Sequence, residues 1–251
     1  MKKNQFIIIV ILIVIFVFLS IFLVFIKKEN VVYLGNSTKV YIKNGEIIKK
    51  EDNRIMNLRE AKIYFEGDFI DGYLRTTKND VVSYNSREAF TKDRKLIVFS
   101  DGLLAYTGSV NIKVDEGKEY DILTNKEKDL LVSIAEENKI SGDIISASRV
   151  DVDINKDKKM ESIYSYTLMD SKKISTIVVL VNGDKYEEIE LSSTNSKYPS
   201  VKRCYLFKLI DFNDDDNYEI VTYCSEGDDS LVKYNIYNYK NGSVSPIKWK
   251  D

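Results

Sequence analysis

Short apolar stretches separated by turn residues make up most of the chain after residue 33, and this pattern predicts a mainly β protein. Val40–Ile48 has the pattern of a hairpin around Asn44-Gly45, a dipeptide that tolerates the positive φ angles of a type I′ turn. Residues 60–114 continue in short apolar stretches, with Asp71-Gly72 among the turn signals between them. We expect a small sandwich or a curled sheet here, within a strand-rich module over residues 27–122.

One segment has a helical pattern instead. Thr124 and Glu127 form a capping box, and an apolar stripe follows at helical spacing, made of Leu130, Leu131, Ile134 and Ala135. We predict one amphipathic helix within a connector over residues 123–140. Its stripe is expected to pack on a sheet, at the seam between the two halves of the chain.

Residues 144–251 contain an internal repeat. Each copy has the order strand, acidic loop, strand, strand, Asn-Gly turn, strand, and the copies are offset by 58 residues at the acidic loop. This order predicts two four-stranded, blade-like β meanders. Two blades cannot close a propeller. The first half of the chain therefore either supplies degenerate blades or forms a separate module.

The N-terminus begins with a long apolar run. Residues 6–26 carry no charge, and as a helix they would span about 31 Å, close to the thickness of the hydrocarbon core. A cleaved secretory signal is the alternative, but the run exceeds the usual length and no A-x-A-like site follows. We expect a transmembrane signal anchor with residues 1–5 as a cytoplasmic tail. This predicts a single-pass protein of the cell membrane, with its N-terminus inside and its C-terminal domain extracytoplasmic.

Composition excludes several classes of site. Without the four lysines that flank the apolar run, 33 basic residues face 39 acidic ones, so the remainder carries −6 and is not expected to bind nucleic acid. The chain has no His, which excludes Ser-His-Asp and Cys-His nucleophile systems and His-bearing zinc sites. Chemistry would have to come from carboxylates, Lys, Tyr or a bound cation.

The acidic loops of the repeat both fit D-x-N-x-D-x-x-x-E. Oxygen side chains at positions 1, 3, 5 and 9 of a short loop suit a hard divalent cation, because Ca²⁺ binds six to eight oxygens and alternate residues of a tight loop point inward. A backbone carbonyl at position 7 would add another ligand. The predicted ligands are Asp153, Asn155, Asp157, Lys159 (carbonyl) and Glu161 in the first loop, and Asp211, Asn213, Asp215, Asn217 (carbonyl) and Glu219 in the second.

This repeated motif resembles the FG-GAP or VCBS-type repeats of cell-surface proteins, over residues 144–251 only. The resemblance implies propeller-like β blades, Ca²⁺ as the bound ion, and ligand roles for the Asp, Asn and Glu side chains named above. The chain departs from the family at loop position 6, where Lys158 and Asp216 replace the usual Gly. Gly permits the sharp turn with positive φ, and Asp tolerates that conformation better than Lys does.

Charge separates the two loops. Three lysines offset the three acids of the first loop, whereas the second loop has five acids and no base, with Glu226, Asp228 and Asp229 beyond the next strand. We predict that the second loop binds Ca²⁺ and that the first is weak or vestigial. In the alternative interpretation, both are solvated hairpin loops whose Asp and Asn side chains only accept hydrogen bonds from local backbone N–H groups.

Cys204 and Cys224 lie on the two strands that flank the second loop. If those strands pair around the loop, both sulfurs lie on the same face of the sheet, because side chains alternate with period two. Two interpretations stay open at this point: a cross-strand disulfide and a pair of buried thiols. The disulfide would place the domain in an oxidising, extracytoplasmic space.

These features predict a non-catalytic, membrane-anchored surface protein whose calcium-binding β repeats form an interaction module. Its predicted partners are the lipid bilayer, through residues 6–26, and a protein or a cell-wall glycan. One alternative is an accessory subunit of a membrane assembly. A less favoured one is an extracytoplasmic hydrolase that uses paired carboxylates, since no acid is identifiable in a pocket that would shift its pKa.

Overall fold

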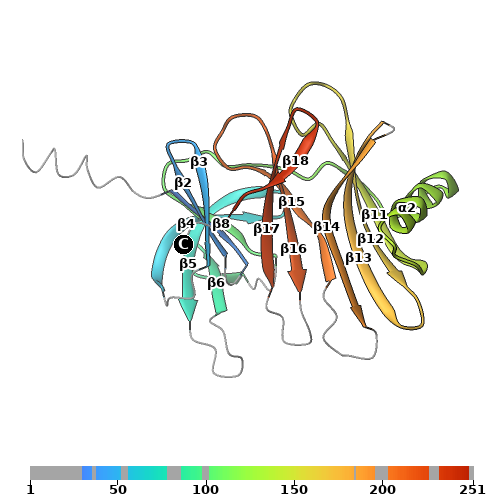
Figure 1. Ribbon diagram of the computed structural model, residues 1–251. Helices are drawn as coiled ribbons and strands as arrows, with labels where there is room; N and C mark the ends of the chain where they lie inside the picture. The colour runs from blue at the N-terminus through green and yellow to red at the C-terminus, as the bar shows by residue number, and fades with distance from the viewer. Residues whose placement is uncertain are drawn as a thin grey trace, which may run out of the picture.

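The computed structural model of this protein describes residues 30–35, 38–51, 56–77, 86–97, 102–183, 185–195, 203–225 and 232–248. Within these residues the chain forms three antiparallel sheets and one α-helix, arranged as successive layers (Figure 1). We name the sheets by the part of the chain that dominates each: the N-terminal sheet, the first-repeat sheet and the second-repeat sheet.

The N-terminal sheet has eight strands in the order β3-β2-β1-β8-β4-β5-β6-β7. The β2–β3 hairpin turns at Asn44-Gly45, where both residues have positive φ (54° and 78°), as the sequence predicts. β8 lies between β1 and β4, so this strand joins the two halves of the sheet. The strands are β1 (Asn30–Leu34), β2 (Thr38–Lys43), β3 (Glu46–Glu51), β4 (Met56–Phe65), β5 (Asp68–Thr77), β6 (Ser86–Thr91), β7 (Leu96–Ile97) and β8 (Leu104–Thr107).

The two repeats each form the four-stranded meander that their strand order predicts, and each gains a fifth strand from upstream. The first-repeat sheet has the order β10-β11-β12-β13-β14, and the second-repeat sheet has the order β18-β17-β16-β15-β9. The strands of the first are β10 (Lys118–Tyr120), β11 (Asp143–Val152), β12 (Glu161–Met169), β13 (Lys173–Asn182) and β14 (Lys185–Asn195). Those of the second are β9 (Lys113–Asp115), β15 (Arg203–Asp211), β16 (Glu219–Ser225), β17 (Lys233–Lys240) and β18 (Ser243–Pro246).

The hairpin of β9 and β10 lies before the predicted boundary at residue 122, and its strands pair with strands beyond it. β9 pairs with β15 and β10 pairs with β11. One turn therefore supplies an edge strand to both repeat sheets. Gly117 makes the turn feasible: its φ is +61°, and a Cβ there would lie 2.5 Å from Val150 Cγ1.

The second-repeat sheet is the central layer of the molecule. On one face, Ile210, Phe212 and Tyr234 pack with Val32, Leu34 and Leu104 of the N-terminal sheet. On the other face, Leu209, Ile220 and Tyr237 pack with Val152, Ile163 and Leu180 of the first-repeat sheet. The β residues of this layer are thus apolar on both faces, as in a sheet covered on both sides.

Helix α2 (Asn125–Glu137) has the predicted capping box at Thr124 and Glu127. Its position differs from the prediction. Leu131, Ile134 and Ala135 pack on the outer face of the first-repeat sheet, against Tyr166 among others, so α2 covers one end of the layered molecule and does not lie at a seam (Figure 1).

The predicted fold class included a transmembrane helix, and this part is corrected. Within the part of the chain that the structure describes, no helix is long and apolar enough to cross a membrane. α2 has 13 residues, fewer than the roughly 20 apolar residues needed to span a bilayer. Residues 6–26, where the helix was predicted, and the predicted tail over residues 1–5 lie outside the described residues.

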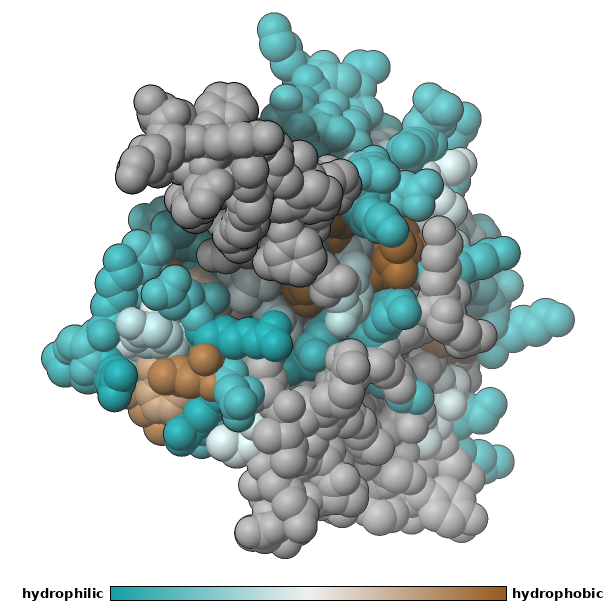
Figure 2. Space-filling model, turned by 90° about the vertical axis from the view of Figure 1, so that its left-hand side faces the viewer, coloured by the Kyte–Doolittle hydropathy of each residue, from teal (hydrophilic) through white to brown (hydrophobic). Residues whose placement is uncertain are grey.

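The outer side of the N-terminal sheet faces the viewer in Figure 2. The coloured surface there is mainly hydrophilic, with hydrophobic side chains showing in small groups between polar ones.

Candidate functional site

Each acidic loop joins the first two strands of its meander, β11 to β12 and β15 to β16. Because the strands alternate in direction, each loop lies at the same end of its sheet as the Asn-Gly turn that follows two strands later (Figure 1). The two loops also touch: the Tyr218 backbone N–H, at position 8 of the second loop, donates a hydrogen bond to the Ile154 carbonyl, at position 2 of the first (2.9 Å).

The two loops share one backbone conformation. Position 4 and position 6 have positive φ in both copies: 57° and 71° at Lys156 and Lys158, and 59° and 63° at Asp214 and Asp216. Position 6 is where the FG-GAP and VCBS repeats have Gly. The chain therefore keeps the sharp turn with non-glycine residues, at a conformational cost of roughly 1 kcal/mol for each.

The first carboxylate of each loop holds that turn. Asp153 Oδ2 accepts a hydrogen bond from the Lys158 N–H (2.9 Å), and Asp211 Oδ2 accepts the equivalent bond from the Asp216 N–H (3.1 Å). Asp211 Oδ1 also accepts from the Asp215 N–H (3.2 Å). Position 1 therefore organises the loop as well as offering a ligand oxygen.

The last carboxylate of each loop is buried. Glu161 is 1% exposed and Glu219 is 4% exposed. Glu161 Oε2 accepts from the Ile154 N–H (3.1 Å), and Glu219 Oε2 accepts from the Phe212 N–H (3.3 Å), so position 9 binds position 2 in both copies. Burial, followed by the nearby Asp carboxylates, raises the pKa of Glu161, and the same causes raise the pKa of Glu219 to about 8.

Positions 3, 5 and 7 complete the shared pattern. Asp157 Oδ1 accepts from the Lys159 N–H, and Asp215 Oδ1 accepts from the Asn217 N–H (2.9 Å each). Position 3 differs between the copies. The side chain of Asn155 accepts a bond from the Asp157 N–H (3.2 Å), whereas Asn213 donates to Asp215 Oδ2 (3.0 Å) and to the Gly45 carbonyl (3.2 Å).

One buried oxygen in each loop accepts no hydrogen bond. These atoms are Asp153 Oδ1 at position 1 of the first loop and Asn213 Oδ1 at position 3 of the second. A buried polar atom without a partner is unfavourable by about 1–3 kcal/mol. A hard cation bound among the loop oxygens would give both atoms a partner, so the residues present fit Ca²⁺ in donor type and in order along the loop.

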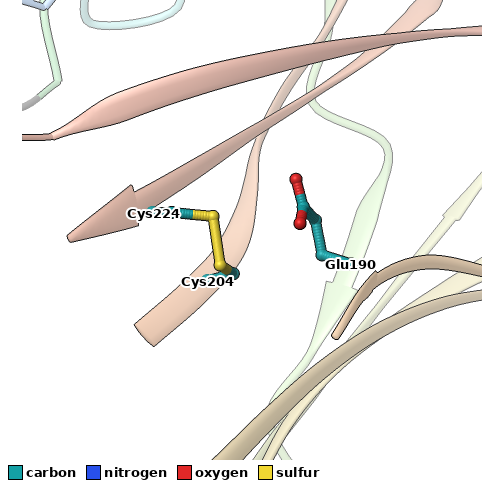
Figure 3. Close-up of side chains that lie close together, drawn as sticks. All are labelled: Glu190, Cys204 and Cys224. Carbon is teal, nitrogen blue, oxygen red and sulfur yellow. A yellow bond between two sulfur atoms is a disulfide. The ribbon is translucent and has the colours of Figure 1, made fainter. Parts of the chain in front are cut away.

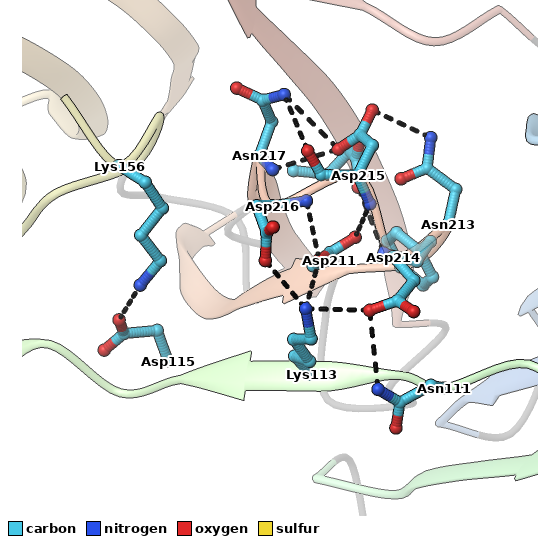
Figure 4. A network of polar contacts seen from close by, with 12 residues as sticks. Asn111, Lys113, Asp115, Lys156, Asp211, Asn213, Asp214, Asp215, Asp216 and Asn217 are labelled. Atoms are coloured by element: carbon cyan, nitrogen blue, oxygen red, sulfur yellow. Dashed lines mark hydrogen bonds and ion pairs between the residues drawn. The ribbon is translucent and has the colours of Figure 1, made fainter.

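A cation from another strand alters the charge of the second loop. Lys113 Nζ on β9 lies 2.7 Å from both Asp214 Oδ1 and Asp216 Oδ1, and 3.7 Å from Asp211 Oδ2 (Figure 4). Hydrogen bonds to Asp214 and Asp216 raise the pKa of Lys113. The second loop has no basic residue in its own sequence, but the fold brings one to it. No sequence pattern indicates this contact, because Lys113 is 98 residues before Asp211.

The lysines of the first loop also differ from the prediction. Lys156 Nζ pairs outside its own loop: it lies 3.5 Å from Asp115 Oδ2 (Figure 4) and 4.5 Å from the centre of the Tyr218 ring. It therefore offsets the ligand carboxylates less than the local count of charges implies. The ranking of the second loop above the first stays a prediction. Glu226, Asp228 and Asp229 lie outside the described residues.

Cys204 and Cys224 are directly opposed on β15 and β16 and form a disulfide, with a Cα–Cα distance of 4.1 Å (Figure 3). Glu190 of β14 lies beside it and accepts hydrogen bonds from Thr222, Asn235 and Tyr237. Within the described residues, these two cysteines and Glu190 are the only three metal-ligating side chains whose donor atoms all lie within 4.8 Å of one another. The two sulfurs are bonded to each other, and Glu190 already accepts three hydrogen bonds. We therefore interpret this group as a buried polar contact between sheets and not as a metal site.

Among the residues that the structure describes, the three carboxylates of each acidic loop do not all lie within 4.8 Å of one another. Binding of Ca²⁺ would therefore draw the ligand side chains closer together.

A cleft of about 440 Å³ opens beside the second loop. Its lining includes loop positions 3, 5, 7, 8 and 9. The rest of the lining comes from the β2–β3 turn and from the segments around the β17–β18 turn.

Comparison with known proteins identified no relative: no family model, no curated protein and no solved structure matches this chain.

Proposed function

We propose that this protein is a non-catalytic, extracytoplasmic binding module whose two acidic loops bind Ca²⁺. The observation that carries the proposal is the geometry that the two loops share. In both, positions 4 and 6 adopt positive φ, position 1 accepts the N–H of position 6, and position 9 accepts the N–H of position 2.

The shared geometry favours an ion over simple local hydrogen bonding. Asx-type turns explain the bonds at positions 1 and 5. They do not explain two Glu side chains that are almost fully buried with raised pKa values, or one unpartnered buried oxygen in each loop. A divalent cation would stabilise all of these groups at once.

The location rests on the disulfide between Cys204 and Cys224, because disulfides persist in oxidising spaces. Extracellular calcium-binding modules have dissociation constants of about 10⁻⁴–10⁻³ M, so even a weak site would be partly occupied outside the cell. An ion at ten times its dissociation constant adds about 1.4 kcal/mol of stability, which is enough to order a loop. The partner of the module would be a protein or a cell-wall glycan.

Calorimetric titration of the full chain with CaCl₂ tests the proposal. We expect two binding events in the unmodified protein and one in each of two variants, Asp153→Ala with Asp157→Ala and Asp211→Ala with Asp215→Ala. Asp214→Ala is the matched control, because Asp214 belongs to the second loop but pairs with Lys113. A flat titration of the unmodified protein, together with melting temperatures that are equal in Ca²⁺ and in chelator, would exclude calcium binding.

A further inference from the structure

The cleft beside the second loop has a wall of candidate ligand oxygens. Asn213, Asp215, Asn217 and Glu219 line it, whereas Asp211 is fully buried behind them. Ca²⁺ takes six to eight oxygens, and the loop offers one group at each of five positions. The remaining coordination positions would therefore face the cleft, since the buried side of the loop is closed by Asp211.

One buried oxygen at this wall has no partner: Asn213 Oδ1 accepts no hydrogen bond. Glu219 is 4% exposed and also lines the cleft, and its Oε2 accepts the Phe212 N–H. The unpartnered oxygen of Asn213 points to a ligand at the loop independently of the number of acids there.

The lining of the cleft also includes two lysines. Lys240, at the end of β17, and Lys248, just after β18, both line the cleft and are exposed. Within the described part of the chain neither forms an ion pair, although Asp215 and Glu219 line the same cleft. The lining of the cleft therefore combines two lysines with three acids, Glu46, Asp215 and Glu219.

The repeat shows that these lysines belong to the second copy alone. Aligning the Asn-Gly turns at Asn182 and Asn241 offsets the copies by 59 residues (241 − 182), so Lys240 corresponds to Val181 and Lys248 to Ile189. The first copy thus keeps the loop motif and has apolar residues where the second has lysines. The two loops would bind the same ion but would not present the same ligand site.

We propose that this cleft binds the oxyanion of a small polar ligand, a carboxylate or a phosphate monoester, between Ca²⁺ in the second loop and the ammonium groups of Lys240 and Lys248. This inference rests on the proposed calcium binding. One oxyanion oxygen completes the coordination of the ion and the others accept from the lysines. A volume of about 440 Å³ accommodates a group the size of a monosaccharide.

Calorimetry of the full chain tests this with D-glucuronate, D-glucose 6-phosphate and neutral D-glucose as probes. With CaCl₂ present, we expect at least one acidic probe to bind and D-glucose to give no heat. The stronger of the two acidic probes identifies the source of the oxyanion as carboxylate or phosphate. In EGTA, binding of the acidic probe should fall at least tenfold.

The decisive variant is Lys240→Ala with Lys248→Ala. We expect at least a tenfold loss of affinity for the acidic probe and an unchanged Ca²⁺ titration, with an unchanged circular dichroism spectrum as the check on folding. Lys233→Ala is the matched control, because Lys233 is an exposed lysine of β17 that does not line the cleft; it should bind the probe normally.

The outcomes separate the two proposals. Calcium heat without probe heat overturns the oxyanion site and leaves calcium binding intact. Probe binding that persists in EGTA, or in the double lysine variant, also overturns it. Absence of calcium heat overturns both.

Discussion

Position 6 of each acidic loop shows how a single residue can depart from a motif while the conformation is kept. Lys158 and Asp216 adopt positive φ, which Gly would adopt without strain. The hydrogen bonds from their N–H groups to Asp153 and Asp211 offset that strain. The first Asp of the motif therefore has a structural role even before any ion is considered.

Glu219 predicts a pH dependence of stability. Its pKa of about 8 in the folded protein lies above the ordinary value of 4.5, so the folded state retains a proton that the unfolded state has lost. This proton's contribution to the free energy of unfolding is fully present below about pH 4.5 and is lost as the pH rises towards 8. The free energy of unfolding falls by at most about 1.4 kcal/mol for each pH unit in that range. Denaturant unfolding in chelator at pH 5, 6.5 and 8 measures this.

In Glu219→Gln the fall in stability between pH 5 and pH 8 should be smaller, because the amide does not ionise. Ca²⁺ should reverse the fall in the unmodified protein, since the ion stabilises the carboxylate form. A Gln variant with the same pH profile as the unmodified protein would show that Glu219 is not the titrating group.

Lys113 predicts a competition with the ion. Its Nζ lies 3.7 Å from Asp211 Oδ2, so its charge opposes a cation bound to that carboxylate. We expect Lys113→Met to raise the Ca²⁺ affinity of the second loop by up to about fivefold, since an exposed ion pair is worth about 0.2–1 kcal/mol. Calorimetry measures the change.

Lys156→Met is the control for Lys113, because Lys156 pairs with Asp115 and not with a ligand carboxylate. A lower affinity in Lys113→Met would show instead that Lys113 holds the loop in its binding conformation through Asp214 and Asp216.

At the scale of elements, β15 and β16 are held in register by the disulfide as well as by their backbone ladder. Cys204 and Cys224 are opposed in that ladder, 20 residues apart in the sequence. The cross-link therefore fixes the two strands from which the second acidic loop projects. A slip by one residue would turn Leu209 and Ile210 to the wrong faces of a sheet that is covered on both sides.

Replacing both cysteines, Cys204→Ala with Cys224→Ala, should lower the free energy of unfolding by about 2–4 kcal/mol, because the cross-link restricts the unfolded chain. Denaturant unfolding measures the loss. Reductant should destabilise the unmodified protein and leave the double variant unchanged. Two free thiols in the unfolded, unreduced protein would contradict the disulfide.

At the scale of the whole molecule, the fold is a stack of layers: α2, the first-repeat sheet, the second-repeat sheet and the N-terminal sheet (Figure 1). The repeat sheets each depend on strands that precede the repeat itself. β9 and β10 complete them from residues 113–120, and α2 covers the buried side chain of Tyr166.

This arrangement predicts how fragments behave. A fragment of residues 144–251 lacks β9, β10 and α2, and it exposes the apolar face that α2 covers; we expect it to unfold without a cooperative transition. A fragment of residues 110–251 contains all three elements and should unfold cooperatively. It should be less stable than the full chain, because Ile210, Phe212 and Tyr234 lose the N-terminal sheet. Thermal melts followed by circular dichroism compare the three.

Equal cooperativity and equal melting temperatures for the two fragments would show that the repeat alone is a folding unit. In that case the domain boundary expected at residue 144 would be the physical one, and the β9–β10 hairpin would be an accessory to it.

The sequence by itself determined the local structure of this protein: the Asn44-Gly45 turn, the capping box of α2 and the two meanders with their matching loops. Backbone preferences and hydrophobic periodicity act over a few residues, so a single sequence carries them. Asp71-Gly72 shows the limit of that reasoning. It is a turn signal in sequence, but Gly72 lies inside β5, where a Cβ would come within 2.2 Å of the Phe90 carbonyl oxygen.

Only the tertiary structure decided which distant segments meet. It placed Lys113 beside Asp214 and Asp216, set β9 and β10 on different sheets, moved α2 to the end of the stack, and brought Lys240 and Lys248 to the cleft that Glu219 also lines. These contacts depend on which apolar faces pack together, and the faces come from segments more than 20 residues apart in the sequence. Burial of those faces rewards any close-packed arrangement, and no local pattern in the sequence distinguishes one from another.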